Sequence, residues 1–126
     1  MINHSISVAI PVYNGENHIE VQLRSILNQT LLPNDIIICD DCSTDKTVDV
    51  INNIINESSI NKRIIKIFKN SKRLGMDLNF EKAISLCNSD YIFLSDADDY
   101  WFKNKISYMY NKIHNTNNLI ALNNCR

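Results

Sequence analysis

Short apolar runs alternate along the chain with longer stretches in which apolar residues recur every three or four positions. The runs are rich in isoleucine and predict four strands, at residues 6–10, 36–39, 64–68 and 91–94. The periodic stretches predict four helices, which contain residues 18–28, 48–55, 80–87 and 106–113. Strict alternation of strand and helix forces parallel pairing through right-handed crossovers. The sequence therefore predicts an α/β fold in which helices flank an open, mostly parallel sheet, and a further run at 120–122 predicts the start of a fifth strand.

The size and composition of the chain are those of one soluble domain. It has 126 residues, of which 44% are hydrophobic and 21% charged. A net charge of -1 provides no field that attracts a polyanion, so no nucleic-acid partner is expected. The N-terminus lacks the basic region of a signal peptide, and no run approaches the roughly 20 apolar residues that cross a bilayer. These features predict a cytoplasmic protein, with no more than peripheral contact with the inner face of the cytoplasmic membrane.

Cys39 and Cys42 have the spacing of a redox or zinc-binding cysteine pair. The two aspartates between them disfavour thiolate formation, and Cys39 falls inside a predicted buried strand rather than at an exposed helix start. The sequence therefore argues against redox or zinc chemistry at this pair.

Three polar clusters follow the first, second and fourth predicted strands, at residues 11–14, 40–45 and 95–99. Parallel strands end at one edge of a sheet, and ligands of open α/β sheets bind beyond that edge. Five carboxylates gather there, from Asp40, Asp41, Asp96, Asp98 and Asp99. Like charges in one place repel unless a cation lies between them. Hard carboxylate oxygens suit Mg²⁺ or Mn²⁺, which in proteins commonly completes its coordination with phosphate oxygens, so the pattern predicts a cation that binds a diphosphate.

Five segments together resemble the glycosyltransferase family 2 members of the GT-A fold, a Rossmann-like nucleotide-sugar-binding architecture. They are Ile6–Gly15, Ser25–Thr30, Cys39–Asp45, Asn79–Ala83 and Tyr91–Trp101. The resemblance implies that residues 1–126 form the nucleotide-sugar-binding part of a GT-A domain, truncated before its acceptor-binding half. It also implies transfer of a sugar, with inversion, from a nucleotide-diphospho-sugar to a glycan or lipid-linked saccharide. UDP-sugars are favoured, and bacterial polysaccharide or lipopolysaccharide synthesis is the implied setting.

The resemblance also implies which residues bind the donor. The nucleotide-binding set comprises Pro11, Val12, Tyr13, Asn14, Glu16, Asp41, Arg73, Asp96 and Ala97. In the family the segment like Pro11 to Asn14 wraps the base and ribose, and the acid at the position of Asp41 accepts a hydrogen bond from the uracil ring nitrogen. The family's Asp-x-Asp motif corresponds to Asp96 and Asp98, with Asp98 the favoured direct metal ligand and Asp99 expected behind the ligands.

The catalytic base of the family lies later in the sequence than the segments matched here, so no catalytic residue is predicted in this chain. We expect the chain to bind a nucleotide sugar with little or no transfer activity of its own. The aromatic run at 100–102 is expected to pack under the metal-binding loop.

Other α/β proteins fit less well. Receiver domains place their acid pair after the first strand, and haloacid-dehalogenase-type phosphatases place their nucleophile there, whereas this chain has Pro11 to Asn14 at that point. The chain has two glycines, so it contains no dinucleotide-binding Gly-x-Gly-x-x-Gly motif. A non-catalytic nucleotide-sugar-binding or partner subunit stays open as an alternative.

Overall fold

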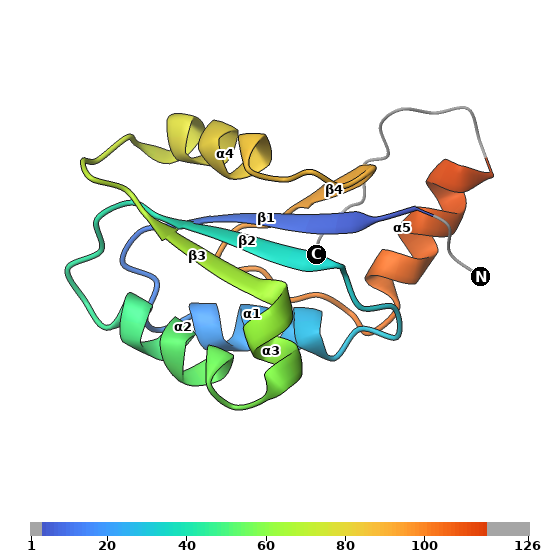
Figure 1. The fold of residues 1–126 in the computed structure, drawn as a ribbon, viewed down its shortest axis with the longest axis horizontal. Coiled ribbons are helices and arrows are strands. Elements are labelled where there is room, and N and C mark those ends of the chain that lie inside the picture. The colour runs from blue at the N-terminus through green and yellow to red at the C-terminus, as the bar shows by residue number, and fades with distance from the viewer. Residues whose placement is uncertain (1–3, 116–126) are drawn as a thin grey trace.

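A four-stranded parallel sheet forms the centre of the computed structural model, which describes residues 4–115. The strands have the order β3-β2-β1-β4 (Figure 1). Their bounds are Ile6–Val12 for β1, Asp35–Asp40 for β2, Ile65–Lys69 for β3 and Tyr91–Leu94 for β4. Every neighbouring pair is parallel, which confirms the predicted α/β sheet. The predicted run at 120–122 lies outside the described residues.

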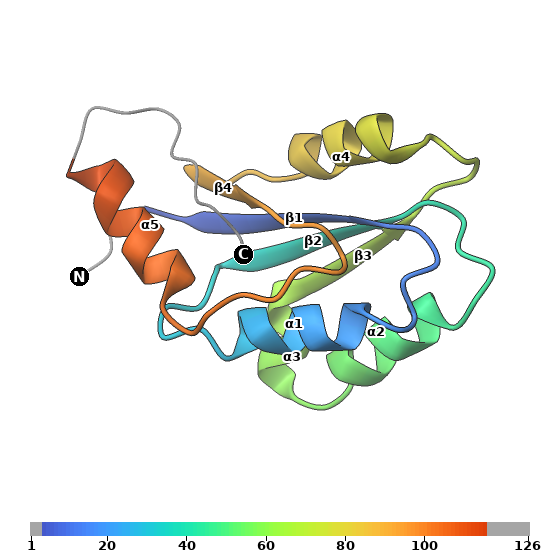
Figure 2. The same ribbon diagram turned by 180° about the vertical axis from the view of Figure 1, so that it is seen from behind.

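Helices cover both faces of this sheet. They are α1 at Ile19–Leu27, α2 at Thr47–Ile55, α3 at Ser59–Ile64, α4 at Met76–Ser85 and α5 at Lys105–His114. Figures 1 and 2 show α1, α2 and α3 on one face and α4 on the other. α5 lies at the end of the sheet where β1 begins, and there His4 Nδ1 is 3.2 Å from the Tyr110 hydroxyl. No helix in the described range 4–115 is long and apolar enough to cross a membrane.

Two helix predictions differ from the structure. No helix was predicted in the polar stretch after α2, but it contains α3, whose first turn is capped by Ser58 Oγ accepting from the Asn61 amide. Only two of its six residues are buried, so its apolar periodicity is too short to detect. α4 begins at Met76, four residues before the predicted apolar stripe starts at Phe80.

β1 continues through Pro11, where the sequence predicted that it stops. Ala9 accepts a hydrogen bond from the Ser95 amide on the β4 side, and Pro11 faces the same side because alternate residues of a strand do. β4 has already ended there, at Leu94. Proline is tolerated because its missing N–H has no strand to bond. On the other side of β1, Val12 still accepts from the Asp41 amide at 2.8 Å.

The main core lies between the sheet and the α1, α2 side, and a smaller cluster lies under α4. All seven residues of β1 are buried. Trp101 is also buried in the main core, at 1% exposure, whereas Tyr100 and Phe102 are 64% and 66% exposed. The expectation that the whole aromatic run packs inward is therefore wrong for two of its three members. The reason is that α5 begins only at Lys105, so residues 100–102 form an extended connection with alternating sides.

We predict that Trp101→Ala lowers the free energy of unfolding by about 3–5 kcal/mol, the usual cost of removing a large buried aromatic. The matched change Phe102→Ala, next to it and exposed, should cost less than about 0.5 kcal/mol. Urea unfolding followed by far-ultraviolet circular dichroism measures both. Equal losses in the two variants would show that Trp101 is not the anchor of this segment.

Candidate functional site

A cavity of about 400 Å³ lies at the edge of the sheet where the strands end. Its size is within the usual range for small-molecule sites. The end of β1, the loops after β1, β2, β3 and β4, and the start of α4 contribute its lining. The lining residues are Pro11, Val12, Tyr13, Asn14, Gly15, His18, Asp41, Arg73, Met76, Asn79, Asp96, Ala97 and Asp98. All the predicted nucleotide-binding and metal-binding residues except Glu16 are in this lining.

Asp41 is the most enclosed charged group of the cavity, with 2% exposure. One carboxylate oxygen accepts from the Leu74 amide at 2.7 Å and from Asn70 Nδ2 at 3.0 Å. The other accepts from the Gly75 amide at 3.0 Å and from Arg73 Nε at 3.2 Å. A carboxylate offers about four acceptor positions, so these four donors saturate it.

The donors also set the charge state of Asp41. Burial on its own would raise the pKa of this carboxyl, but the hydrogen bonds from Asn70, Leu74, Gly75 and Arg73 outweigh burial and lower the pKa. The Gly75 amide can reach Asp41 because Gly75 has φ of +86°, a region that side-chain-bearing residues rarely adopt. Asp41 is therefore held ionised.

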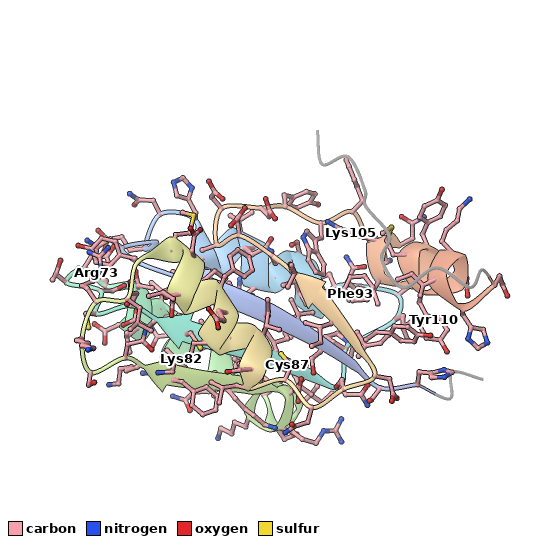
Figure 3. All side chains as sticks on the ribbon, turned by 90° about the horizontal axis from the view of Figure 1, so that it is seen from above. Arg73, Lys82, Cys87, Phe93, Lys105 and Tyr110 are labelled. Carbon is pink, nitrogen blue, oxygen red and sulfur yellow. The ribbon has the colours of Figure 1, made fainter. Side chains whose placement is uncertain are left out.

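Arg73 and Tyr13 lie against each other in the same cavity. The Arg73 guanidinium carbon is 3.4 Å from the centroid of the Tyr13 ring, a cation–π contact. Figure 3 shows Arg73 at the end of the sheet where the chain turns into α4. Its side chain is 50% exposed, and its contacts with Tyr13 and Asp41 hold it against the protein.

Asn14 joins the loop after β1 to the loop after β2. It has φ of +48°, and its side-chain Oδ1 accepts from the Thr44 amide at 2.8 Å. Its own amide donates to Ser43 Oγ at 2.8 Å. The next residue, Gly15, has no room for a side chain, because a Cβ there would lie 2.9 Å from Val12 Cγ2. These contacts fix the wall formed by residues 11–15.

Glu16 is the one predicted nucleotide-binding residue that does not line the cavity. Its carboxylate accepts from the Lys46 amide at 3.0 Å, and its own amide donates to Asp45. Asp45 also accepts from the Thr47 amide at the first residue of α2. Glu16 and Asp45 therefore pin the two loops together behind the cavity wall.

Three carboxylates cluster in the loop after β4. Oxygens of Asp96, Asp98 and Asp99 lie within 4.8 Å of one another, and Asp99 also accepts from the Asp96 amide at 3.2 Å. Partial burial raises the pKa of Asp96, and the charges of Asp99 and Asp98 raise it further. Asp99 was expected behind the metal ligands, but the structure brings it into the same cluster. Three hard oxygen donors under mutual repulsion fit a divalent cation.

The sequence did not reveal how Asn70 and Asn79 support the site. Asn70 donates to both Asp41 and Asn79 Oδ1, and its own Oδ1 accepts from Lys82 Nζ at 2.7 Å. Asn79 donates to the Cys39 carbonyl at 2.8 Å. The sequence contained one indication of the role of Asn70, since this residue directly follows β3 at the same edge of the sheet as the acidic clusters.

Cys39 and Cys42 have separate environments. Cys39 is buried in β2, and burial raises the pKa of its thiol to about 11. Cys42 donates from Sγ to the Asn70 carbonyl. Both are free thiols.

We predict that Asp41→Asn lowers the free energy of unfolding at neutral pH by about 3 kcal/mol, because the amide cannot satisfy the same buried donors. The folded-state pKa of Asp41 is lowered, so its stabilisation is complete above the unfolded value of about 3.9 and is lost as pH falls through the folded value. The advantage of the wild type over the variant should therefore shrink below about pH 4. Urea unfolding across pH measures it. Asp49→Asn, an exposed change on α2, is the control and should cost less than about 0.5 kcal/mol.

Comparison with known proteins shows close similarity to one family. The family model described as "Glycosyl transferase family 2" matches residues 7–125. WfaP of Escherichia coli, a UDP-Glc:alpha-D-GlcNAc-diphosphoundecaprenol beta-1,3-glucosyltransferase, is 40% identical over 109 residues, which cover 86% of this chain and 40% of WfaP. RfbG of Shigella flexneri, a dTDP-rhamnosyl transferase, is 42% identical over 99 residues, which cover 75% of this chain and 33% of RfbG.

Solved structures show the same similarity in fold. TarS of S. aureus in complex with UDP-GlcNAc superposes with a TM-score of 0.77 at 25% identity, over 88% of this chain and 31% of the TarS chain. The mannosyltransferase PcManGT of Pyrobaculum calidifontis, in complex with GDP-Man and Mn²⁺, has a TM-score of 0.69 at 22% identity, over 80% of this chain and 29% of that chain. The chain thus spans about two fifths or less of the length of these relatives.

Proposed function

Because the chain belongs to glycosyltransferase family 2, we propose that its cavity binds a nucleotide-diphospho-sugar, with UDP-sugars favoured, as the donor for sugar transfer. In this proposal residues 1–126 are the nucleotide-sugar-binding part of a GT-A domain. The observation that carries the proposal is the meeting, in one cavity, of a buried ionised acceptor, an aromatic ring and a separate acidic cluster. The acceptor suits the N–H of a nucleobase, the aromatic ring suits the face of the base, and the acidic cluster suits a metal-bound diphosphate.

We assign the binding of the nucleobase to Asp41, where the base would replace one of the present hydrogen-bond donors. Asp41 is saturated, so an incoming N–H must replace one of its four donors. Arg73 is the one to leave, because it is half-exposed and makes the longest contact, whereas Asn70 is buried and the other two donors are backbone amides. The released guanidinium can then donate to a carbonyl of the base. Uracil and thymine present an N–H flanked by carbonyls, and two relatives are named for UDP- and dTDP-sugars.

Tyr13 would provide the stacking surface for the base. Tyr13 is 43% exposed, and the planar Arg73 guanidinium lies against its ring. A base that stacks on Tyr13 would take the place of that guanidinium. One movement of Arg73 would therefore free both the hydrogen-bond acceptor and the stacking face.

The acidic cluster is proposed to hold a divalent cation, Mg²⁺ or Mn²⁺, through Asp98 and Asp96, with Asp99 beside them. A relative of the same fold has been solved with Mn²⁺, and the oxygens of the three aspartates lie close enough to share one ion. Such a cation supplies Lewis-acid neutralisation of the charge that develops on the diphosphate leaving group. Asp41, Arg73 and Tyr13 would meanwhile orient the nucleoside, so that the sugar lies beyond the diphosphate and toward the acceptor.

The acceptor is proposed to be a saccharide or lipid-linked saccharide, with inversion at the transferred sugar. The relative WfaP is named for a diphosphoundecaprenol-linked acceptor, which supports the lipid-linked class. Inverting transfer requires a base that removes the proton of the acceptor hydroxyl. The residues assigned above bind the donor, and none of them is assigned as the base that deprotonates the acceptor.

We predict that UDP binds the chain in the presence of Mn²⁺ and binds more weakly in the presence of EDTA, as measured by isothermal titration calorimetry. Tyr13→Ala should weaken UDP binding about 10-fold or more, since base stacking on an aromatic ring contributes about 1–3 kcal/mol. Tyr108→Ala, an exposed tyrosine on α5 outside the cavity, is the matched control and should bind as the wild type does. Failure of UDP, dTDP and GDP alike to bind with Mn²⁺ present would contradict the proposed function.

We also predict that Asp98→Asn has opposite effects without and with ligands. The raised pKa of Asp96 means that its ionised form is disfavoured in the folded state, so removing the neighbouring charge should maintain or raise the thermal midpoint at neutral pH in EDTA. With Mn²⁺ and saturating UDP, the wild-type midpoint should rise, by the equivalent of about 2.7 kcal/mol at 100-fold excess over Kd, and the variant should not. If the variant keeps the Mn²⁺-dependent rise in thermal midpoint, Asp98 is not a ligand of the cation.

A further inference from the structure

Lys82 on α4 is joined to the buried carboxylate of Asp41 through a single side chain. Its Nζ donates to Asn70 Oδ1 at 2.7 Å, and Asn70 Nδ2 donates to Asp41 Oδ1 at 3.0 Å. Two hydrogen bonds and one amide group separate the ammonium from the carboxylate, so the two charges are no more than about 8 Å apart. Figure 3 shows Lys82 on α4, set back from Arg73 at the end of the sheet.

The neighbours of Asn70 fix which way its amide faces. Asn79 Nδ2 donates to the Cys39 carbonyl, so Asn79 Oδ1 is left to accept from Asn70 Nδ2 at 2.8 Å. An ionised carboxylate also only accepts, so the two N–H bonds of the Asn70 amide point to Asn79 and Asp41. Asn70 Oδ1 then requires a donor, which is Lys82. The ammonium polarises this amide and strengthens its hydrogen bond to Asp41.

The two cations that support Asp41 are held differently. Arg73 contacts the carboxylate directly at 3.2 Å, lines the cavity and is half-exposed. Lys82 is less exposed, its partner Asn70 is buried, and neither is among the lining residues. Burial raises the pKa of the nearby Cys39 thiol, and the charge of Lys82 lowers it in part. Lys82 is therefore a fixed positive charge behind the carboxylate, whereas Arg73 can be exchanged for a ligand.

This difference matters once a base occupies the cavity. In the proposed function, on which this inference rests, the ring N–H of the base takes the position of Arg73 on Asp41. A neutral base then covers a carboxylate that has lost its direct bond to a cation. A buried carboxylate without a countercharge tends to take up a proton. Lys82 is not displaced, because Asn70 lies between it and the carboxylate.

We propose that Lys82, acting through Asn70, is the fixed countercharge that keeps Asp41 ionised under a bound base and thereby selects bases with a ring N–H. An ionised carboxylate accepts from the N–H of uracil or thymine but repels the lone pair of cytosine N3. A protonated carboxyl would instead donate to that nitrogen. Lys82 is a positioning residue, since it does not touch the nucleotide. It also lies in the last turn of α4, where a cation favours the helix dipole, and that role alone would not affect base choice.

Other titratable groups surround the cavity or adjoin Asp41 and give nucleotide binding a pH dependence of their own. They include Tyr13, His18, Asp40, Cys42, Asp96 and Asp98. The phosphate groups of the nucleotide titrate as well. All of these groups are the same in the wild type and in a Lys82 variant. The ratio of the two dissociation constants at each pH therefore isolates the contribution of Lys82.

Isothermal titration calorimetry with UDP and with CDP, in the presence of Mn²⁺, tests the proposal. Lys82→Met should bind UDP about 10-fold more weakly than the wild type at about pH 8.5, because Asp41 is then ionised without its countercharge. At about pH 5.5 the loss should shrink by about half or more, because binding to the variant takes up a proton on Asp41. At that pH the preference of the variant for UDP over CDP should be about 10-fold smaller than that of the wild type.

Lys82→Arg keeps the charge and a donor to Asn70, so it should restore the wild-type pH dependence and base preference. Lys62→Met removes an exposed lysine of α3 outside this network and should bind as the wild type does at every pH. If Lys82→Met lacks the far-ultraviolet circular dichroism of the wild type, Lys82→Gln replaces it with the same expected results. A loss that is equal at every pH, with an unchanged base preference, would make Lys82 a structural residue and overturn this proposal alone. Failure of the wild type to bind UDP, dTDP and GDP would instead overturn the proposed function, and this proposal with it.

Discussion

The buried carboxylate of Asp41 connects segments that are far apart in the sequence. It stands at the end of β2 and accepts from Asn70 after β3 and from the Leu74 and Gly75 amides at the start of α4. A single ionised group thereby sets where the loop between β3 and α4 runs. The position of Arg73, and with it one wall of the cavity, follows from that loop. Because the carboxylate is shielded from water, each of these bonds is stronger than it would be on the surface.

The acidic groups of the cavity have opposite electrostatic environments. Asp41 is surrounded by donors, which keep its pKa low in spite of burial. Partial burial raises the pKa of Asp96, and the two neighbouring carboxylates raise it further. One end of the cavity lining is therefore electrostatically satisfied without a ligand, and the loop after β4 is not. In the proposed function, this difference separates the position of a neutral base from that of a cation and a diphosphate.

The sequence was sufficient for features that depend on pattern. Apolar runs and their polar ends predicted the parallel sheet, and parallel strands brought Asp41, Asp96 and Asp98 to one cavity lining. It was insufficient where several segments decide one position. α3 lacks a periodic stripe, and Tyr100 and Phe102 are exposed because the chain stays extended before α5. The displacement of Glu16 from the cavity depends on the Lys46 amide, which approaches only when the two loops are folded together.

Pro11 has a consequence for the shape of the site. It lies on β1 past the point where β4 ends, and it lines the cavity. Any other residue would direct an amide donor into that space, and the donor would require water or another strand as a partner. The pyrrolidine ring of Pro11 leaves that part of the floor without an N–H donor that would lose its hydration when a flat molecule lies on it. It also denies an extended chain the bond with which pairing would begin, which keeps the floor open to small ligands.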